Sequence, residues 1–128
     1  MPARLRPADP LAVAAAADRL SAGGAERADL KLLVKHYLAL LEEKAPGHSV
    51  EVRVPPYAAV QCSAVRDGVL DPGPTHTRGT PPNVVETDAV TFLRLCTGRT
   101  AWSEALVSGV IAASGLRADL SEMVPLLG

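Results

Sequence analysis

The chain has 128 residues, of which 48% are hydrophobic and 21% charged, and its formal net charge is -1. This composition is typical of one globular domain and excludes an extensively disordered chain. Nucleic-acid binding needs a basic face, and no Lys/Arg cluster of that size is present. Aromatic residues make up only 3%, so aliphatic side chains must fill the core and line any pocket.

The N-terminal twenty residues contain an apolar run from Leu11 to Ala17, as a secretory signal peptide would. Asp9 and Pro10 stand directly before this run, and no convincing cleavage site follows it. An Ala-rich helix with Asp9 as N-cap and Pro10 at its first position explains the same residues. Because no stretch of ~20 apolar residues exists, we expect a cytoplasmic protein with no integral membrane segment.

A second, amphipathic helix follows, with Lys31, Lys35 and Glu42 on its polar side. Pro46-Gly47 ends it. We therefore divide the single domain into an N-terminal helix and connection, residues 1–28, and a core, residues 29–128. The apolar positions of the second helix, spaced three and four residues apart, are Leu30, Leu33, Val34, Tyr37, Leu38 and Leu41.

The hydrophobic period then changes to two. Val50, Val52 and Val54 alternate with polar residues, which predicts a half-buried strand. Residues 57–63 predict a second strand, paired with the first as an antiparallel hairpin across an irregular Pro55-Pro56 turn.

Residues 64–83 form a long connection rich in Gly and Pro, and such loops are usually functional or disordered. A short strand is predicted within it, near either Val69-Leu70 or His76-Thr77. Residues 84–87 predict the next strand.

The second half of the chain predicts a helix capped by Thr87 or Asp88 and ending at Thr97. Thr100 is the expected cap of a shorter helix, and residues 110–114 predict a strand. Pro125 forbids one long C-terminal helix, so we expect a short helical segment before it and an extended end lying over the domain. This order of elements predicts an α+β fold.

The stretch from Val84 to Trp102, with the later Gly109–Gly115, resembles the second half of sterol carrier proteins. The segments Arg53–Cys62, His76–Asp88 and Ala113–Ser121 are similar to a bacterial branch of that family, and to tail domains of thiol-dependent bacterial isomerase-type enzymes. The marks of the resemblance are Leu95, Gly98, Arg99, Ala105, Gly109, Ser114 and Gly115.

The resemblance implies a mixed or antiparallel sheet of about five strands, with helices packed on one face and an apolar tunnel between the layers. It also implies reversible binding of sterols or acyl chains without catalysis. The chain departs from the family in ending without a peroxisomal address, and in an extra stretch, residues 64–73, whose role the pattern does not give.

Apolar side chains of the helices and the last strand are the candidate lining of that tunnel, and the alternative is that they only fill the core. His76 and Arg78 are candidates for a polar head-group site, and the alternative is an ordinary surface loop. Arg117 and Asp119 could pair with Arg99 or Glu86 and hold the tail across a tunnel mouth. The candidate ligand-binding residues are Phe92, Leu93, Leu95, Trp102, Leu106, Val110, Met123 and Leu127.

Other chemistry has little support in the sequence. The three histidines lack metal-ligand spacing, no phosphate-binding loop is present, and Cys62 and Cys96 favour buried free thiols over a disulfide. We therefore expect no cofactor, no metal and no catalytic residue.

Three hypotheses remain open. The first is a non-enzymatic carrier of a lipid, sterol or other hydrophobic small molecule. The second is a protein-interaction or accessory domain, acting as a homodimer or on an enzyme partner. The third is an enzyme that uses the loop of His76 and Arg78.

Overall fold

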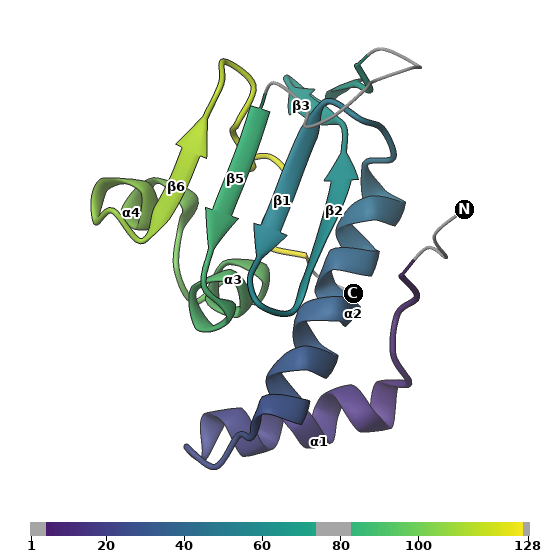
Figure 1. Cartoon of the computed structure of the whole chain (residues 1–128), viewed down its shortest axis with the longest axis vertical. Coiled ribbons are helices and arrows are strands. Elements are labelled where there is room, and N and C mark those ends of the chain that lie inside the picture. Colours follow the sequence, from purple (N-terminus) through teal and green to yellow (C-terminus); the bar gives the residue numbers. More distant parts are fainter. Residues whose placement is uncertain (1–4, 74–82, 127–128) are drawn as a thin grey trace.

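The computed structural model describes residues 5–73 and 83–126, and their fold is the predicted α+β type. Four helices accompany a four-stranded mixed sheet and a separate two-stranded one (Figure 1). The elements are α1 (Pro10–Ser21), α2 (Arg27–Lys44), β1 (Val50–Val54), β2 (Ala58–Cys62), β3 (Ala64–Arg66), β4 (Val69–Asp71), β5 (Asn83–Thr87), α3 (Ala89–Cys96), α4 (Trp102–Val107) and β6 (Ile111–Ser114).

The main sheet has the strand order β2-β1-β5-β6. β1 and β2 form the predicted antiparallel hairpin, with Val52 opposite Val60, while β1 and β5 run parallel, with Val52 opposite Val85. The antiparallel pairing of β5 with β6 leaves β6 at one edge of the sheet.

The period-two pattern of β1 separates the two faces of this sheet. Val50, Val52 and Val54 are fully buried in the core, whereas the alternating Glu51 and Arg53 are only half-buried and form an ion pair. Helix α3 and the C-terminal segment lie behind the sheet as drawn, and the front face is free of helices (Figure 1). The predicted packing of helices on one face is confirmed.

The two long N-terminal helices begin close to the positions that the sequence predicts. The Asp9 side chain accepts hydrogen bonds from the backbone N–H groups of Leu11 and Ala12, so the predicted N-cap of α1 is confirmed. Helix α2 starts at Arg27, two residues before the boundary that we placed between the N-terminal segment and the core. No helix in the described part of the chain has the length and hydropathy needed to cross a membrane.

Of the two predicted caps of α3, Thr87 and Asp88, the structure has Asp88, whose carboxylate accepts from the N–H of Thr91. The prediction that Thr100 caps the next helix is wrong. Because α4 begins at Trp102, its N-cap is Ala101, and the N–H of Thr100 donates instead to the carbonyl of Arg94.

The long connection contains a small hairpin, β3 with β4, and the predicted strand near Val69-Leu70 is confirmed as β4. The described residues therefore form four plus two strands, where the resemblance implied about five in one sheet. The alternative strand at His76-Thr77 lies outside the described residues.

The C-terminal segment differs from the sequence prediction. Residues 116–124 form turns and no helix, because few of their N–H groups donate to the carbonyl four residues earlier, as they would in an α-helix. The segment is instead held by distant partners. The Glu122 carboxylate accepts from the N–H groups of Asp67 and Gly68 at 2.7 and 2.9 Å, and the N–H of Leu126 donates to Cys96.

The predicted partners of Arg117 are also wrong. Its guanidinium pairs with Asp71 of β4 at 2.7 Å, and its backbone N–H donates to the side chain of Asn83. The Asp119 carboxylate accepts from the N–H of Ser121. The charges around Arg117 therefore join the C-terminal segment to the small hairpin, away from Arg99 and Glu86.

Candidate functional site

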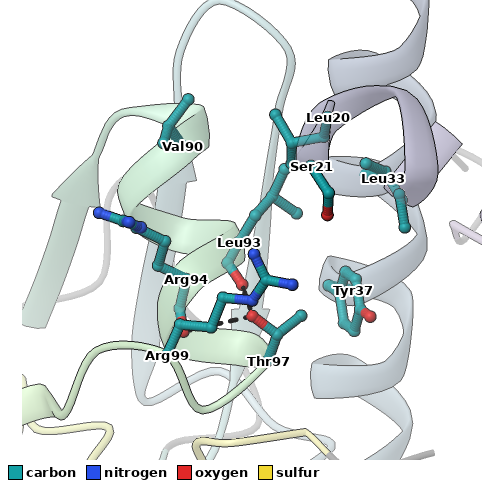
Figure 2. A pocket seen from close by; sticks show the side chains of 10 residues that line it. Leu20, Ser21, Leu33, Tyr37, Val90, Leu93, Arg94, Thr97 and Arg99 are labelled. Carbon is teal, nitrogen blue, oxygen red and sulfur yellow. Dashed lines mark hydrogen bonds between the residues drawn. The ribbon is translucent and has the colours of Figure 1, made fainter. Parts of the chain in front are cut away.

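A hollow of about 390 Å³ lies where α1, α2 and α3 meet, and we call it the three-helix groove (Figure 2). Its apolar side chains come from all three helices, and its polar side chains come mainly from the end of α3 and the turn after it. The lining residues are Ala17, Leu20, Ser21, Leu33, Tyr37, Val90, Leu93, Arg94, Thr97 and Arg99.

Helix α1 is positioned as one wall of this groove by an ion pair. Nε and Nη2 of Arg19 both donate to Oδ1 of Asp29, at 2.9 and 2.7 Å. The second oxygen of Asp29 accepts from the N–H of Glu26, which caps α2. This hydrogen bonding, with that from Arg19 first, lowers the pKa of the Asp29 carboxyl. One carboxylate therefore both starts α2 and fixes α1 across it.

The floor of the groove is aliphatic. Leu33 and Leu93 are nearly fully buried, and Leu20 stands over them from α1. These side chains belong to the amphipathic faces of their helices, which also build the core. An alkyl chain could therefore contact this floor without displacing water from any polar group of the protein.

The polar rim is cationic. The Arg99 side chain points into the groove, between Leu93, Thr97 and Tyr37, while Arg94 points outward (Figure 2). Within the described part of the chain, neither arginine forms an ion pair with a carboxylate.

The other polar groups of the rim are neutral. The Thr97 hydroxyl donates to the Leu93 carbonyl at 2.8 Å. Burial raises the pKa of the Tyr37 hydroxyl, which stays protonated at neutral pH. The guanidinium of Arg99 is thus the charged group available to a ligand in this groove.

A second hollow of about 390 Å³ lies between the connection of α3 to α4 and the C-terminal segment. Trp102 and Leu95 contribute to it, and both are largely buried. It shares no residue with the three-helix groove. Its lining residues are Leu95, Gly98, Thr100, Ala101, Trp102, Ser103, Ser121, Val124 and Pro125.

The predicted ligand-binding residues do not meet in one place. Leu93 lies in the three-helix groove, Leu95 and Trp102 line the second hollow, and Phe92 and Met123 belong to the hydrophobic core without lining either. Leu106 and Val110 are 44% and 46% exposed and line neither hollow. The predicted head-group residues His76 and Arg78, and Leu127, lie outside the described residues.

The sequence prediction missed most of this groove. Leu20, Ser21 and Arg99 line it, and none of the three is among the predicted ligand contacts. Their spacing carries no signal for it, because α1 reaches α3 only through its crossing over α2. Gly98 and Arg99 are among the marks of the family resemblance, which is the sequence feature that directs attention to the turn after α3.

The thiols are poorly suited to nucleophilic chemistry. Burial raises the pKa of the Cys62 thiol to about 12, and burial also raises the pKa of the Cys96 thiol. Both are free cysteines. Across residues 5–73 and 83–126, no three His, Cys, Asp or Glu side chains gather into a group that could hold a metal ion.

Comparison with known protein families gives a match over most of the chain. The family described as bacterial SCP ortholog matches residues 26–126, from the N-cap of α2 to the end of the described chain. Helix α1 lies outside the matched range. A comparison with curated proteins gives no match. With most of its length matched, and with the α+β architecture described above, this chain belongs to the sterol carrier protein family, in its bacterial branch.

Proposed function

We propose that this protein reversibly binds an aliphatic molecule with an anionic head, such as a fatty acid, in the three-helix groove. The observation that carries the proposal is one hollow that combines an aliphatic floor with an inward-pointing Arg99, which forms no ion pair with any described residue. Its volume of about 390 Å³ falls in the range of small-molecule sites, roughly 300–1,000 Å³. Membership of the sterol carrier protein family supports a carrier role.

The expected affinity depends on how much of an alkyl chain the groove covers. Each methylene fully removed from water contributes about 0.8 kcal/mol, so ten fully covered methylenes would set an upper limit of about 8 kcal/mol. Loss of translational, rotational and chain freedom offsets several kcal/mol of that gain. The net affinity is therefore moderate, which suits a carrier that must release its cargo.

The charged head would bind to Arg99. A guanidinium offers a planar fork of donors that matches a carboxylate or a phosphate. A hydrogen bond to a charged group contributes about 1.5–3 kcal/mol. The few aromatic residues favour an alkyl body over a flat ring system, so we expect fatty acids to bind better than sterols.

The proposed role is that of a carrier and not of an enzyme. The two thiols have raised pKa values, and none of the residues that line the groove is a histidine or a carboxylate. A groove of this kind has no general base that could activate water or a nucleophile.

The experiment compares two ligands that differ only in the head. Palmitate and hexadecanol are titrated by displacement of a fluorescent fatty acid, with wild type and with Arg99→Gln. We expect Arg99→Gln to weaken palmitate about tenfold, equivalent to roughly 1.4 kcal/mol, and to leave hexadecanol unchanged. Arg66→Gln, an exposed arginine of β3, is the matched control and should change neither.

Two results would contradict the proposal. If neither ligand displaces the probe, the groove is not a lipid site. If Arg99→Gln weakens both ligands equally, Arg99 supports the local fold and does not bind the head.

A further inference from the structure

Three cations of α2 lie in one row that winds slowly around the helix. Arg27, Lys31 and Lys35 are spaced four residues apart, so their side chains share one face of the helix and succeed one another at about 6 Å. Arg27 and Lys31 are exposed, and Lys35 is half-buried. We call these three residues the cationic row.

The row is unfavourable for the helix that carries it. Like charges four residues apart destabilise a helix, and a cation in the first turn opposes the helix dipole. The three ion pairs of the described residues use other cations, namely Arg19, Arg53 and Arg117. Since the fold gains nothing from placing these charges together, their arrangement points to something outside the chain.

Concave surfaces lie on both sides of the row. A hollow of about 400 Å³ opens toward Pro56 and Tyr57 of the β1–β2 turn. A second, of about 320 Å³, opens toward the N-terminal segment, where Arg6 adds a fourth cation. Both hollows are lined by Ala28, Lys31 and Lys35. The cationic row is thus a ridge between two hollows.

We propose that this ridge docks the acidic face of a protein partner, with carboxylates at about 6 Å intervals as on one side of an acidic helix. Charge complementarity would set the register, and side chains flanking the carboxylates would enter the two hollows. A flat anionic bilayer could contact the cations but would leave the two hollows empty. Protein side chains could enter them, so the concave shape favours a protein partner over a membrane.

The proposed surface is separate from the lipid site. The residues that line the two hollows include none of those that line the three-helix groove. The inference therefore stands or fails independently of the proposed function.

The test uses the full chain and a 15-residue alanine-based helical peptide with Glu at three positions four residues apart. Binding is followed by NMR at low ionic strength, where surface charges are least screened. We expect amide shifts around Lys31 and Lys35, and at least a tenfold loss of affinity in Lys31→Glu, since an attraction becomes a repulsion. Arg66→Glu makes the same change in net charge elsewhere and should lose less than threefold.

A second readout separates binding from folding. Lys31→Glu creates two favourable pairs, with Arg27 before it and Lys35 after it, so its melting temperature should rise by about 2 °C while binding is lost. A scrambled peptide with three adjacent Glu residues should bind more weakly than the regular one.

Three results would overturn the inference. The first is equal loss of peptide binding in Lys31→Glu and Arg66→Glu, which would indicate attraction to net charge alone. The second is binding to vesicles rich in phosphatidylglycerol without binding to the peptide, which would make a bilayer the partner. The third is the absence of amide shifts around Lys31 and Lys35, whether the peptide binds to another surface or does not bind.

Discussion

The three-helix groove and the region where α4 lies beside β6 carry similar aliphatic side chains in opposite situations. In the groove, Leu93 is 3% exposed beneath α1. Beside β6, Leu106 and Val107 are 44% and 89% exposed, and Ile111 is the one buried residue of the strand. The difference arises because three helices cross at the groove, whereas α4 has only six residues and covers little. The hydrophobic pattern of the sequence indicates which side chains are apolar, and the elements that cover them determine which of these are buried.

The largest expected difference between the two regions is in stability. Leu93→Ala removes side-chain atoms that pack in the core and should lower the free energy of unfolding by about 2–4 kcal/mol, whereas Leu106→Ala at a half-exposed site should cost less than about 1 kcal/mol. Urea unfolding of both variants measures this. Equal losses would mean that α4 is packed as tightly as the groove.

Next in size is the effect of removing α1. A chain that begins at Ala25 keeps all elements of the matched family range but loses the wall formed by Ala17, Leu20 and Ser21. We expect the circular dichroism of a folded domain and about a tenfold weaker binding of palmitate, from lost apolar contact. Unchanged palmitate binding by the folded, shortened chain would exclude α1 from the site.

The ion pair that holds α1 predicts a dependence on pH. The Arg19 hydrogen bond lowers the pKa of Asp29 from its ordinary value of 3.8, so the folded state binds fewer protons than the unfolded state. The pair therefore adds stability above pH 3.8, and this is lost as the pH falls through the lowered pKa. Asp29→Asn should melt several degrees below wild type at pH 7, and the gap should narrow below about pH 4. A gap that stays constant down to pH 2 would contradict this account.

The smallest expected effect is at the sheet edge. Val110→Ser changes a side chain that lines neither hollow, so palmitate affinity should stay within about twofold of wild type, less than 0.5 kcal/mol. The displacement titration measures it with the same ligands. A tenfold loss would move the site to the α4–β6 region.

Features encoded by neighbouring residues could be predicted from the sequence. The alternation of Val50, Val52 and Val54 predicted β1 and its buried face. Asp9 predicted where α1 begins, and the choice between Thr87 and Asp88 predicted the start of α3 to within one residue. Each of these depends on contacts within a few residues, where periodicity and capping chemistry act directly.

Features made by distant pairing could not be predicted. The groove depends on the contact of Arg19 with Asp29, and the C-terminal segment depends on Glu122 binding the turn at Asp67. Spacing along the chain carries no record of such contacts. Leu106 shows why burial is harder to predict than secondary structure. It lies in a helix, as its apolar spacing predicted, but no described element covers it, so it is 44% exposed.

Mapping the bound ligand on the protein tests directly whether the three-helix groove is the binding site. Stearate with a nitroxide group on its chain is added to the protein, and paramagnetic broadening of the backbone amides is measured by NMR. We expect broadening at Leu20, Leu93 and Thr97, relieved by excess palmitate. Broadening at Trp102 and Val124, or along α4 and β6, with the three-helix groove unaffected would contradict it.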